Sequence, residues 1–214
     1  MSRTERNIPL SPDDLARFTD VSRETLARLK TYADILVQWQ SAINLVAPST
    51  LADLWRRHFF DSAQLLYHAP KSATTWIDLG SGAGFPGLVL AIMGVEKMHL
   101  VESNRKKCEF LRQVSFATNT PVVVHAKRIE DLRGVKADVV ISRALAPLHR
   151  LLDWAEPFAY ENTVCLFLKG QQVVVELTDT AKYWNISYDL LRSETDSSGV
   201  VVRVKGFRRV AGAS

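Results

Sequence analysis

The stretch that most constrains the fold is WIDLGSGAGFPGL, residues 76–88, in which an apolar run ends in alternating glycines. The apolar run predicts a short buried strand, and the residues after the glycines predict a helix with Pro86 in its first turn. Gly80, Gly82 and Gly84 let the backbone turn sharply and let a ligand approach main-chain N–H groups without meeting a Cβ. The stretch therefore predicts a strand–loop–helix unit that holds a ligand.

Strands and helices alternate through the rest of the chain. The predicted strands of this series are 74–79, 97–103, 121–126, 137–142 and 162–168. Because helical segments separate them, they predict a doubly wound, mostly parallel α/β sheet. Two more strands follow near 188–193 and 199–207, with a turn from Asp196 to Gly199. This tail predicts an antiparallel hairpin that closes a seven-stranded, Rossmann-like sheet.

The first seventy residues have the pattern of helices. Ser11 and Pro12 form a capping signature, with proline at the first helical position. Thr50, with Asp53 three residues later, predicts the start of another helix that ends near residue 68.

Charge divides the chain into two parts. Residues 1–70 carry eight Lys or Arg and eight Asp or Glu, whereas residues 71–214 carry nineteen and fifteen. We expect the first part to be a helical extension that packs as one unit with the α/β domain of the second. The net charge of +4 and the basic clusters at 104–107, 127–128 and 207–209 suit a polyanionic partner.

Apolar runs and cysteines indicate the compartment. No apolar run reaches the length of a membrane span, and the N-terminal MSRTERNIPL has no apolar signal core. Cys108 and Cys165 lie in a predicted helix and a predicted strand without metal-site spacing. We therefore expect a cytoplasmic protein with reduced thiols, no metal and no membrane contact.

Two acidic residues indicate what the glycine loop holds. Glu102 ends the strand after the loop, where an acid accepts hydrogen bonds from ribose hydroxyls in nucleoside-binding sheets. A dinucleotide is one candidate, although Pro86 removes an N–H that a pyrophosphate would use. Asp78 would repel a pyrophosphate and attract a cation. The D-x-G-x-G-x-G form therefore favours S-adenosylmethionine, while a purely structural turn remains the alternative.

Missing signatures narrow the range of candidate methyl-acceptor atoms. Methyltransferases that act on exocyclic amines carry an Asn/Asp-Pro-Pro-aromatic signature after the fourth strand, where this chain has SRALAP at 142–147. Methylation at C5 of pyrimidines needs a nucleophilic cysteine, and Cys108 and Cys165 are poorly placed. N7 of guanine carries no proton to remove, so it needs positioning and no base.

The motifs DLGSGAGFPGLVLAI, VESNRKKCEFLRQV, RIEDL and ISRALAPL occur in this order from residue 78 to 148. With NLVAPSTLADLWRRHFFDS before them and LKG at 168–170, the chain resembles the RsmG or GidB family of small-subunit rRNA guanine-N7 methyltransferases. The resemblance covers about residues 35–170. It implies a class I methyltransferase fold and methyl transfer to N7 of a guanine in the decoding-region loop of 16S rRNA.

The resemblance also implies roles for single residues. Gly80 and Phe85 would contact the cofactor through the first loop, and Ile129 and Glu130 would border its adenine. Arg143 would line the pocket near the methyl donor.

Lys169 is expected at the carboxyl edge of the sheet, where it would contact an RNA phosphate. Arg143 and Lys169 are thus the catalytic candidates. The expected partner is 16S rRNA or the small ribosomal subunit, and the protein is expected to be a monomer.

Plainer interpretations stay open for several of these residues. Arg143 could pair with a structural carboxylate such as Asp78, and Lys169 could be a solvated strand end. His58 and Asp61 lie three apart on one helix face, which fits a local hydrogen bond as well as a role in RNA binding. For the whole chain, an NAD(P)-binding oxidoreductase and a non-enzymatic rRNA-binding protein are the alternatives.

Overall fold

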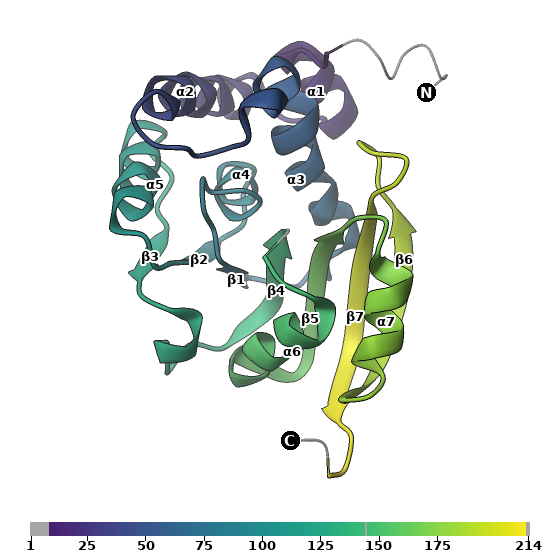
Figure 1. Ribbon diagram of the computed structural model, residues 1–214. Coiled ribbons are helices and arrows are strands. Elements are labelled where there is room, and N and C mark those ends of the chain that lie inside the picture. Colours follow the sequence, from purple (N-terminus) through teal and green to yellow (C-terminus); the bar gives the residue numbers. More distant parts are fainter. Residues whose placement is uncertain (1–8, 144, 213–214) are drawn as a thin grey trace.

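The computed structural model describes residues 9–143 and 145–212. Most of the N-terminal stretch discussed above and Ala144 of the ISRALAPL motif lie outside the described residues. Strands form one seven-stranded sheet (Figure 1). They are β1 (Thr75–Leu79), β2 (Lys97–Glu102), β3 (Val123–Ala126), β4 (Ala137–Arg143), β5 (Ala159–Lys169), β6 (Trp184–Arg192) and β7 (Val200–Arg209).

The helices lie on both faces of this sheet (Figure 1). The α-helices are α1 (Pro12–Thr19), α2 (Arg23–Gln40), α3 (Asp61–Ala63), α4 (Gly87–Ile92), α5 (Arg105–Ala117), α6 (Leu148–Ala155) and α7 (Val173–Thr180). Short 3-10 or π-helical turns are η2 (Pro48–Asp53), η3 (Trp55–Phe60), η4 (Gln64–His68), η5 (Ile129–Asp131) and η6 (Glu156–Phe158).

The strand order is β3-β2-β1-β4-β5-β7-β6. Strands β1 to β5 run parallel, β7 is antiparallel to β5, and β6 is antiparallel to β7. Because helices connect the parallel strands, their carboxyl ends meet at one edge of the sheet. The expected doubly wound sheet with an antiparallel C-terminal hairpin is confirmed.

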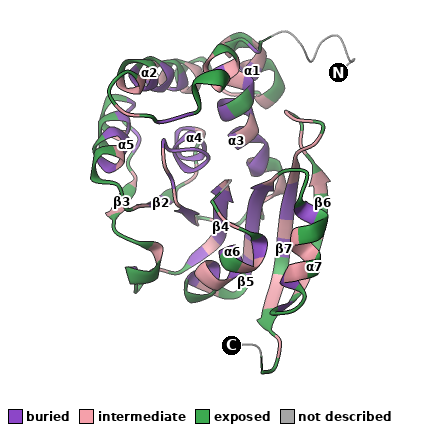
Figure 2. Cartoon of the chain, viewed as in Figure 1, coloured by how far each residue is buried: buried purple, intermediate pink, exposed green. Residues whose placement is uncertain are grey.

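Side chains alternate between two hydrophobic clusters, one on each face of the sheet. In β4, Val139 and Ile141 pack with the N-terminal helices, α4 and α5, whereas Val140 packs with α6. The cluster under the N-terminal helices runs from Leu10 to Val201, so it includes residues from both parts of the chain. Figure 2 shows that burial is greatest in the central strands and in α4.

The predicted helix over 50–68 differs from the structure at its start. The helical segment begins at Pro48 and changes from 3-10 to π to α geometry before it ends at His68. Thr50 does not cap it, because its hydroxyl donates to the carbonyl of Ala47 at 2.7 Å. Proline pre-sets the backbone of a first helical turn, which explains the earlier start. We call residues 48–68 the helical strap.

Candidate active site

The glycine loop after β1 has the backbone that its sequence predicts. Gly80, Gly82 and Gly84 all have positive φ, at 71°, 55° and 90°. A Cβ at Gly82 would meet only the Gly80 carbonyl oxygen, at an ordinary 3.8 Å, so this position is open. In contrast, a Cβ at Gly84 would lie 2.7 Å from the Tyr32 hydroxyl oxygen. Gly84 is thus needed for packing, and Gly82 is the glycine that leaves room for a ligand.

Glu102 holds the loop from the end of the neighbouring strand. Its Oε2 accepts a hydrogen bond from the Gly82 N–H at 2.9 Å, and its Oε1 accepts from the Asn104 N–H at 2.7 Å. A carboxylate has about four acceptor sites, so capacity for ribose hydroxyls remains. The carboxylate is therefore fixed in place at the position where the sequence predicts a ribose contact.

Asp78, which the sequence indicated as an anion suited to a cationic ligand, is fully buried below the loop. Its Oδ2 accepts from the Gly87 N–H at 3.1 Å, and no hydrogen bond reaches its Oδ1 within the described part of the chain. Burial raises the pKa of this carboxyl to about 7. A cation bound in the loop would favour the ionised form, so Asp78 suits a ligand with an ammonium or sulfonium group.

Ile129 and Glu130 lie in η5, directly after β3. Ile129 packs against the hydrophobic cluster that contains α6, and the Glu130 carboxylate accepts from the indole N–H of Trp154 at 2.9 Å. Both residues therefore lie at the carboxyl edge of the sheet, one strand beyond Glu102.

A pocket of about 620 Å³ lies at the same edge, on the other side of β4. Its walls come from the loop before the helical strap, the strap itself, the ends of β4 and β5, and the β6–β7 turn. Three ion pairs line it. They are Arg57–Asp196 at 3.1 Å, Arg143–Asp61 at 3.8 Å and Lys169–Glu176 at 2.6 Å. The pocket is therefore polar, and its cations are held by carboxylates of the chain itself.

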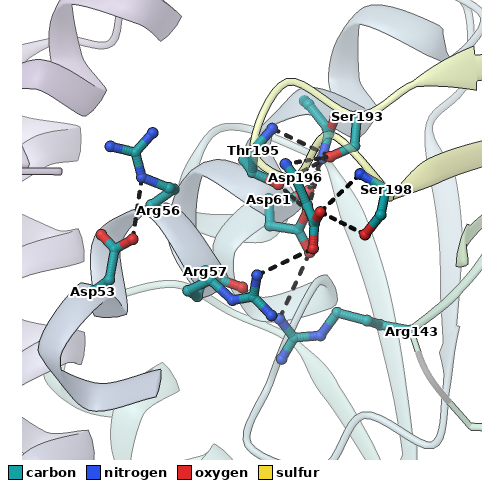
Figure 3. Close-up of polar contacts among 10 residues, drawn as sticks. Asp53, Arg56, Arg57, Asp61, Arg143, Ser193, Thr195, Asp196 and Ser198 are labelled. Atoms are coloured by element: carbon teal, nitrogen blue, oxygen red, sulfur yellow. Dashed lines mark hydrogen bonds and ion pairs between the residues drawn. The ribbon is translucent and has the colours of Figure 1, made fainter. Parts of the chain in front are cut away.

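Arg143 lies at the end of β4 and lines this pocket, and Figure 3 shows its guanidinium close to Asp61 and Arg57. Its Nη1 donates to the carbonyl of Arg57 at 3.1 Å, and its guanidinium carbon lies 5.1 Å from the centre of the Phe85 ring. The carboxylate paired with it is Asp61, so the structural partner suggested from sequence, Asp78, is wrong. Phe85 is buried and stacks on Tyr32, so its ring supports Arg143 and is covered from solvent.

Lys169 lines the pocket, as expected from its place at the end of β5. It is not a solvated lysine, because its side chain is 7% exposed and its ammonium donates to the Ala146 carbonyl at 2.7 Å. Glu176 takes a second N–H. An ammonium group has three donors, so one remains for a ligand in the pocket.

Of the two interpretations left open for His58 and Asp61, the local hydrogen bond between them is wrong. The Nε2 of His58 lies 2.7 Å from the Thr50 hydroxyl, and Asp61 accepts from Thr195 and Gln64 instead. Burial, together with the positive charge of Arg143, lowers the pKa of His58 to about 3. His58 is therefore neutral at ordinary pH.

Sequence patterns missed residues from distant segments that complete the pocket wall or support the glycine loop. Thr195 and Asp196 come from a turn that carries no basic residue, and Tyr32 comes from α2 and donates to the Ala83 carbonyl inside the glycine loop. No periodicity or spacing signal links such segments. The apolar stripe of α2 indicates only that Tyr32 faces a core.

The thiols lie in a helix and a strand as expected, and two of the three basic clusters lie near the candidate site. Cys108 and Cys165 are both buried, and burial raises the pKa of each thiol. Neither is therefore suited to nucleophilic attack. Arg105 and Lys106 begin α5 and are exposed, as is Lys127 after β3, so these cations lie at the carboxyl edge of the sheet. The third cluster, at 207–209, ends β7 and lies at the opposite edge of the sheet, where Arg209 pairs with Glu156.

Two features are absent from residues 9–143 and 145–212. No helix there has the length and hydropathy to cross a membrane. Nor do three His, Cys, Asp or Glu side chains gather there in a way that could hold a metal ion.

The sequence of this chain matches a known protein family. The family described as rRNA small subunit methyltransferase G, or GidB, matches residues 25–197. The chain belongs to this family. A GidB-family relative named ribosomal RNA small subunit methyltransferase G, from Paramagnetospirillum magneticum, is 53% identical over 200 residues, which cover 94% of this chain and 98% of the relative. A relative of the same name from Gluconobacter oxydans is 48% identical over 90% of this chain and 99% of its own length.

Solved structures agree with the GidB-family chain in fold. MtNAS in complex with S-adenosylmethionine matches 92% of this chain and 84% of its own, with a TM-score of 0.58 and 15% identity. M. jannaschii TYW2 in complex with AdoMet matches 70% of this chain and 75% of its own, with a TM-score of 0.53 and 16% identity. At these identities the likeness shows the fold alone, which is that of class I methyltransferases.

Proposed function

We propose that this chain transfers a methyl group from S-adenosylmethionine to N7 of a guanine in the decoding-region loop of 16S rRNA. Membership of the GidB family supports S-adenosylmethionine-dependent methylation of rRNA, without naming the atom that is methylated. It favours this activity over an oxidoreductase and over a non-enzymatic rRNA-binding protein. The choice of N7 rests on the pocket and on the two buried thiols.

The loop region fits the cofactor in three respects. Gly82 leaves open space at a turn, Glu102 presents a fixed carboxylate, and Asp78 keeps a buried oxygen without a hydrogen bond. We assign the binding of the cofactor to Asp78, Gly80, Gly82, Gly84 and Glu102, with Phe85 contributing its main chain. Ile129 and Glu130 would border the adenine. When bound, S-adenosylmethionine supplies an activated methyl group on a sulfonium sulfur.

The pocket beside the loop is the proposed site of the acceptor guanine. N7 has a free lone pair, so the chain needs to orient the base and exclude water without removing a proton. This agrees with a pocket whose carboxylates are all engaged by cations or hydroxyl groups. That observation carries the proposal of N7, because an acceptor amine would call for an available base.

Arg143 and Lys169 are the proposed contacts to the RNA within the pocket. Arginine donors match the O6 and N7 edge of guanine, and O6 stays available when N7 is the reacting atom. The Arg143 guanidinium also lies over the ring of Phe85, which belongs to the proposed cofactor loop. Lys169 would give its remaining N–H to a phosphate. We further propose that the protein acts as a monomer in the cytoplasm on 16S rRNA or the small subunit.

The test is chemical mapping of the product. Small subunits from cells that lack the protein are incubated with purified protein and labelled S-adenosylmethionine. Borohydride and aniline treatment then cleaves rRNA at N7-methylguanosine. The expected result is one new, cofactor-dependent cleavage in the decoding-region loop. Label in another base, without new cleavage, would contradict the N7 assignment.

A further inference from the structure

We propose that Asp61 is a positioning residue that sets the Arg143 guanidinium between the glycine loop and the acceptor pocket, with Thr195 as its support. This inference rests on the proposed function of Arg143. Its starting point is the arrangement of three side chains from distant segments, which Figure 3 shows together.

The two oxygens of Asp61 have different partners. Oδ1 accepts from the Thr195 hydroxyl at 2.6 Å and from the Gln64 amide at 2.9 Å. Oδ2 lies 3.8 Å from Nη1 of Arg143, which is too long for a hydrogen bond but close enough for strong attraction at 17% side-chain exposure. Two neutral donors therefore fix one oxygen and leave the other turned toward the guanidinium.

Arg143 needs such a partner because it is largely buried. Its side chain is 20% exposed, and burial lowers its pKa while Asp61 raises it. The Arg57 carbonyl takes one N–H, and the Phe85 ring covers one side of the plane. Of five guanidinium donors, most stay available for the pocket. Without Asp61, repulsion from Arg57 and the cost of burial would move the guanidinium toward water.

Thr195 connects this pair to the β6–β7 turn. The turn is held to the helical strap by Gln64, which accepts from the Glu194 N–H at 3.0 Å, and by the Arg57–Asp196 pair. Thr195 therefore reaches Asp61 from a supported segment. Supporting groups of this kind hold catalytic side chains in the geometry that the reaction needs.

The experiment compares four variants of the supporting and control residues, together with Arg143→Ala and the Arg143→Ala/Asp61→Asn double variant, in a steady-state methylation assay. Asp61→Asn keeps an oxygen for Thr195 but removes the charge, and Thr195→Val removes the hydroxyl at equal volume. Thr195→Ser restores the hydroxyl. Asp53→Asn is the matched control, because Asp53 lies in the same strap and pairs with Arg56, away from the pocket (Figure 3). Thermal unfolding and cofactor affinity are measured for each protein.

Asp61→Asn should lower kcat by roughly 10- to 100-fold, the usual effect of removing a supporting group, with KM for rRNA and cofactor affinity nearly unchanged. Thr195→Val should show a smaller fall in kcat, and Thr195→Ser and Asp53→Asn none. In the Arg143→Ala background, Asp61→Asn should add no further loss, because the two residues act as one unit.

Two outcomes would overturn the inference alone. Wild-type kcat for Asp61→Asn, or losses that add to those of Arg143→Ala, would show that Asp61 does not act through Arg143. A third outcome would contradict the proposed function of Arg143 instead. If Arg143→Ala keeps wild-type kcat, Arg143 does not have the role on which the inference about Asp61 rests.

Discussion

The Oε2 of Glu102 accepts a hydrogen bond from the main-chain N–H of Gly82 at 2.9 Å, across the gap between two parallel strands. This bond joins the two features that the sequence marked separately, the glycine loop and the acid at the end of the next strand. It fixes the loop before any ligand arrives, so the site is preorganised for a nucleoside.

Replacing Gly82 tests the loop directly. Gly82→Val puts a branched side chain into open space and into a backbone with φ of 55°, so S-adenosylmethionine affinity should fall at least about tenfold, or ~1.4 kcal/mol. Gly134→Val is the matched control, because Gly134 also has positive φ, at 75°, and open surroundings. Calorimetry should show normal affinity for this control. Equal affinity in the two variants would refute the assignment of the loop.

Asp78 should make the ligand-free protein less stable as pH rises. The folded carboxyl keeps its proton up to about pH 7, whereas the unfolded one loses it near 3.8. The folded state thus binds more protons in this window, and unfolding free energy falls with pH by up to ~1.4 kcal/mol per unit. Asp78→Asn should lack this slope in urea unfolding between pH 4 and 8. A wild-type minus variant difference that is flat with pH would contradict the prediction.

His58 should have the opposite effect on the acid side. Its pKa is about 3 in the folded protein and 6.5 when unfolded, so the unfolded state gains a proton first as pH falls. Stability is therefore lost as pH drops from 6.5 toward 3. His58→Gln should remove this loss. Because Asp78 and His58 oppose each other between pH 4 and 6.5, wild-type unfolding should look flatter there than either variant.

Salt dependence tests the RNA contacts. Affinity for rRNA should fall steeply with salt, while cofactor affinity should change little. Lys169→Ala should reduce the salt slope by about one phosphate contact and keep cofactor binding. Lys182→Ala is the control, because Lys182 has the same 2.6 Å pairing with a carboxylate but is exposed outside the pocket. An unchanged slope for Lys169→Ala would assign this lysine to the ion pair with Glu176 alone.

Sequence patterns predicted the features of the fold that depend on residues close together in the chain. Asn104, a residue type that favours the start of a helix, caps α5, and its side chain accepts from the Lys107 N–H. The glycines at positive φ, and the alternation of β4 side chains between the two hydrophobic clusters, follow equally from residues a few positions apart.

Long-range partners could not be predicted in this way. The sequence offered a phosphate contact or a solvated strand end for Lys169, because nothing near it in the sequence indicates Glu176. Asp61 and His58 looked like partners because they are three apart, yet the fold brings Thr195 and Thr50 closer. The partners of these side chains are brought close by the tertiary structure, and a single sequence does not show which distant groups will be neighbours.

The position of β7 between β5 and β6 has a consequence for how the protein is made. Thr195 and Asp196, which complete the pocket wall, lie just before this strand. The strand that follows them pairs with β5, and their side chains bond to Asp61 and Arg57 of the helical strap. A nascent chain that still lacks residues 200–209 already carries the glycine loop, Glu102 and Arg143. The glycine loop is therefore synthesised well before the turn that completes the pocket wall.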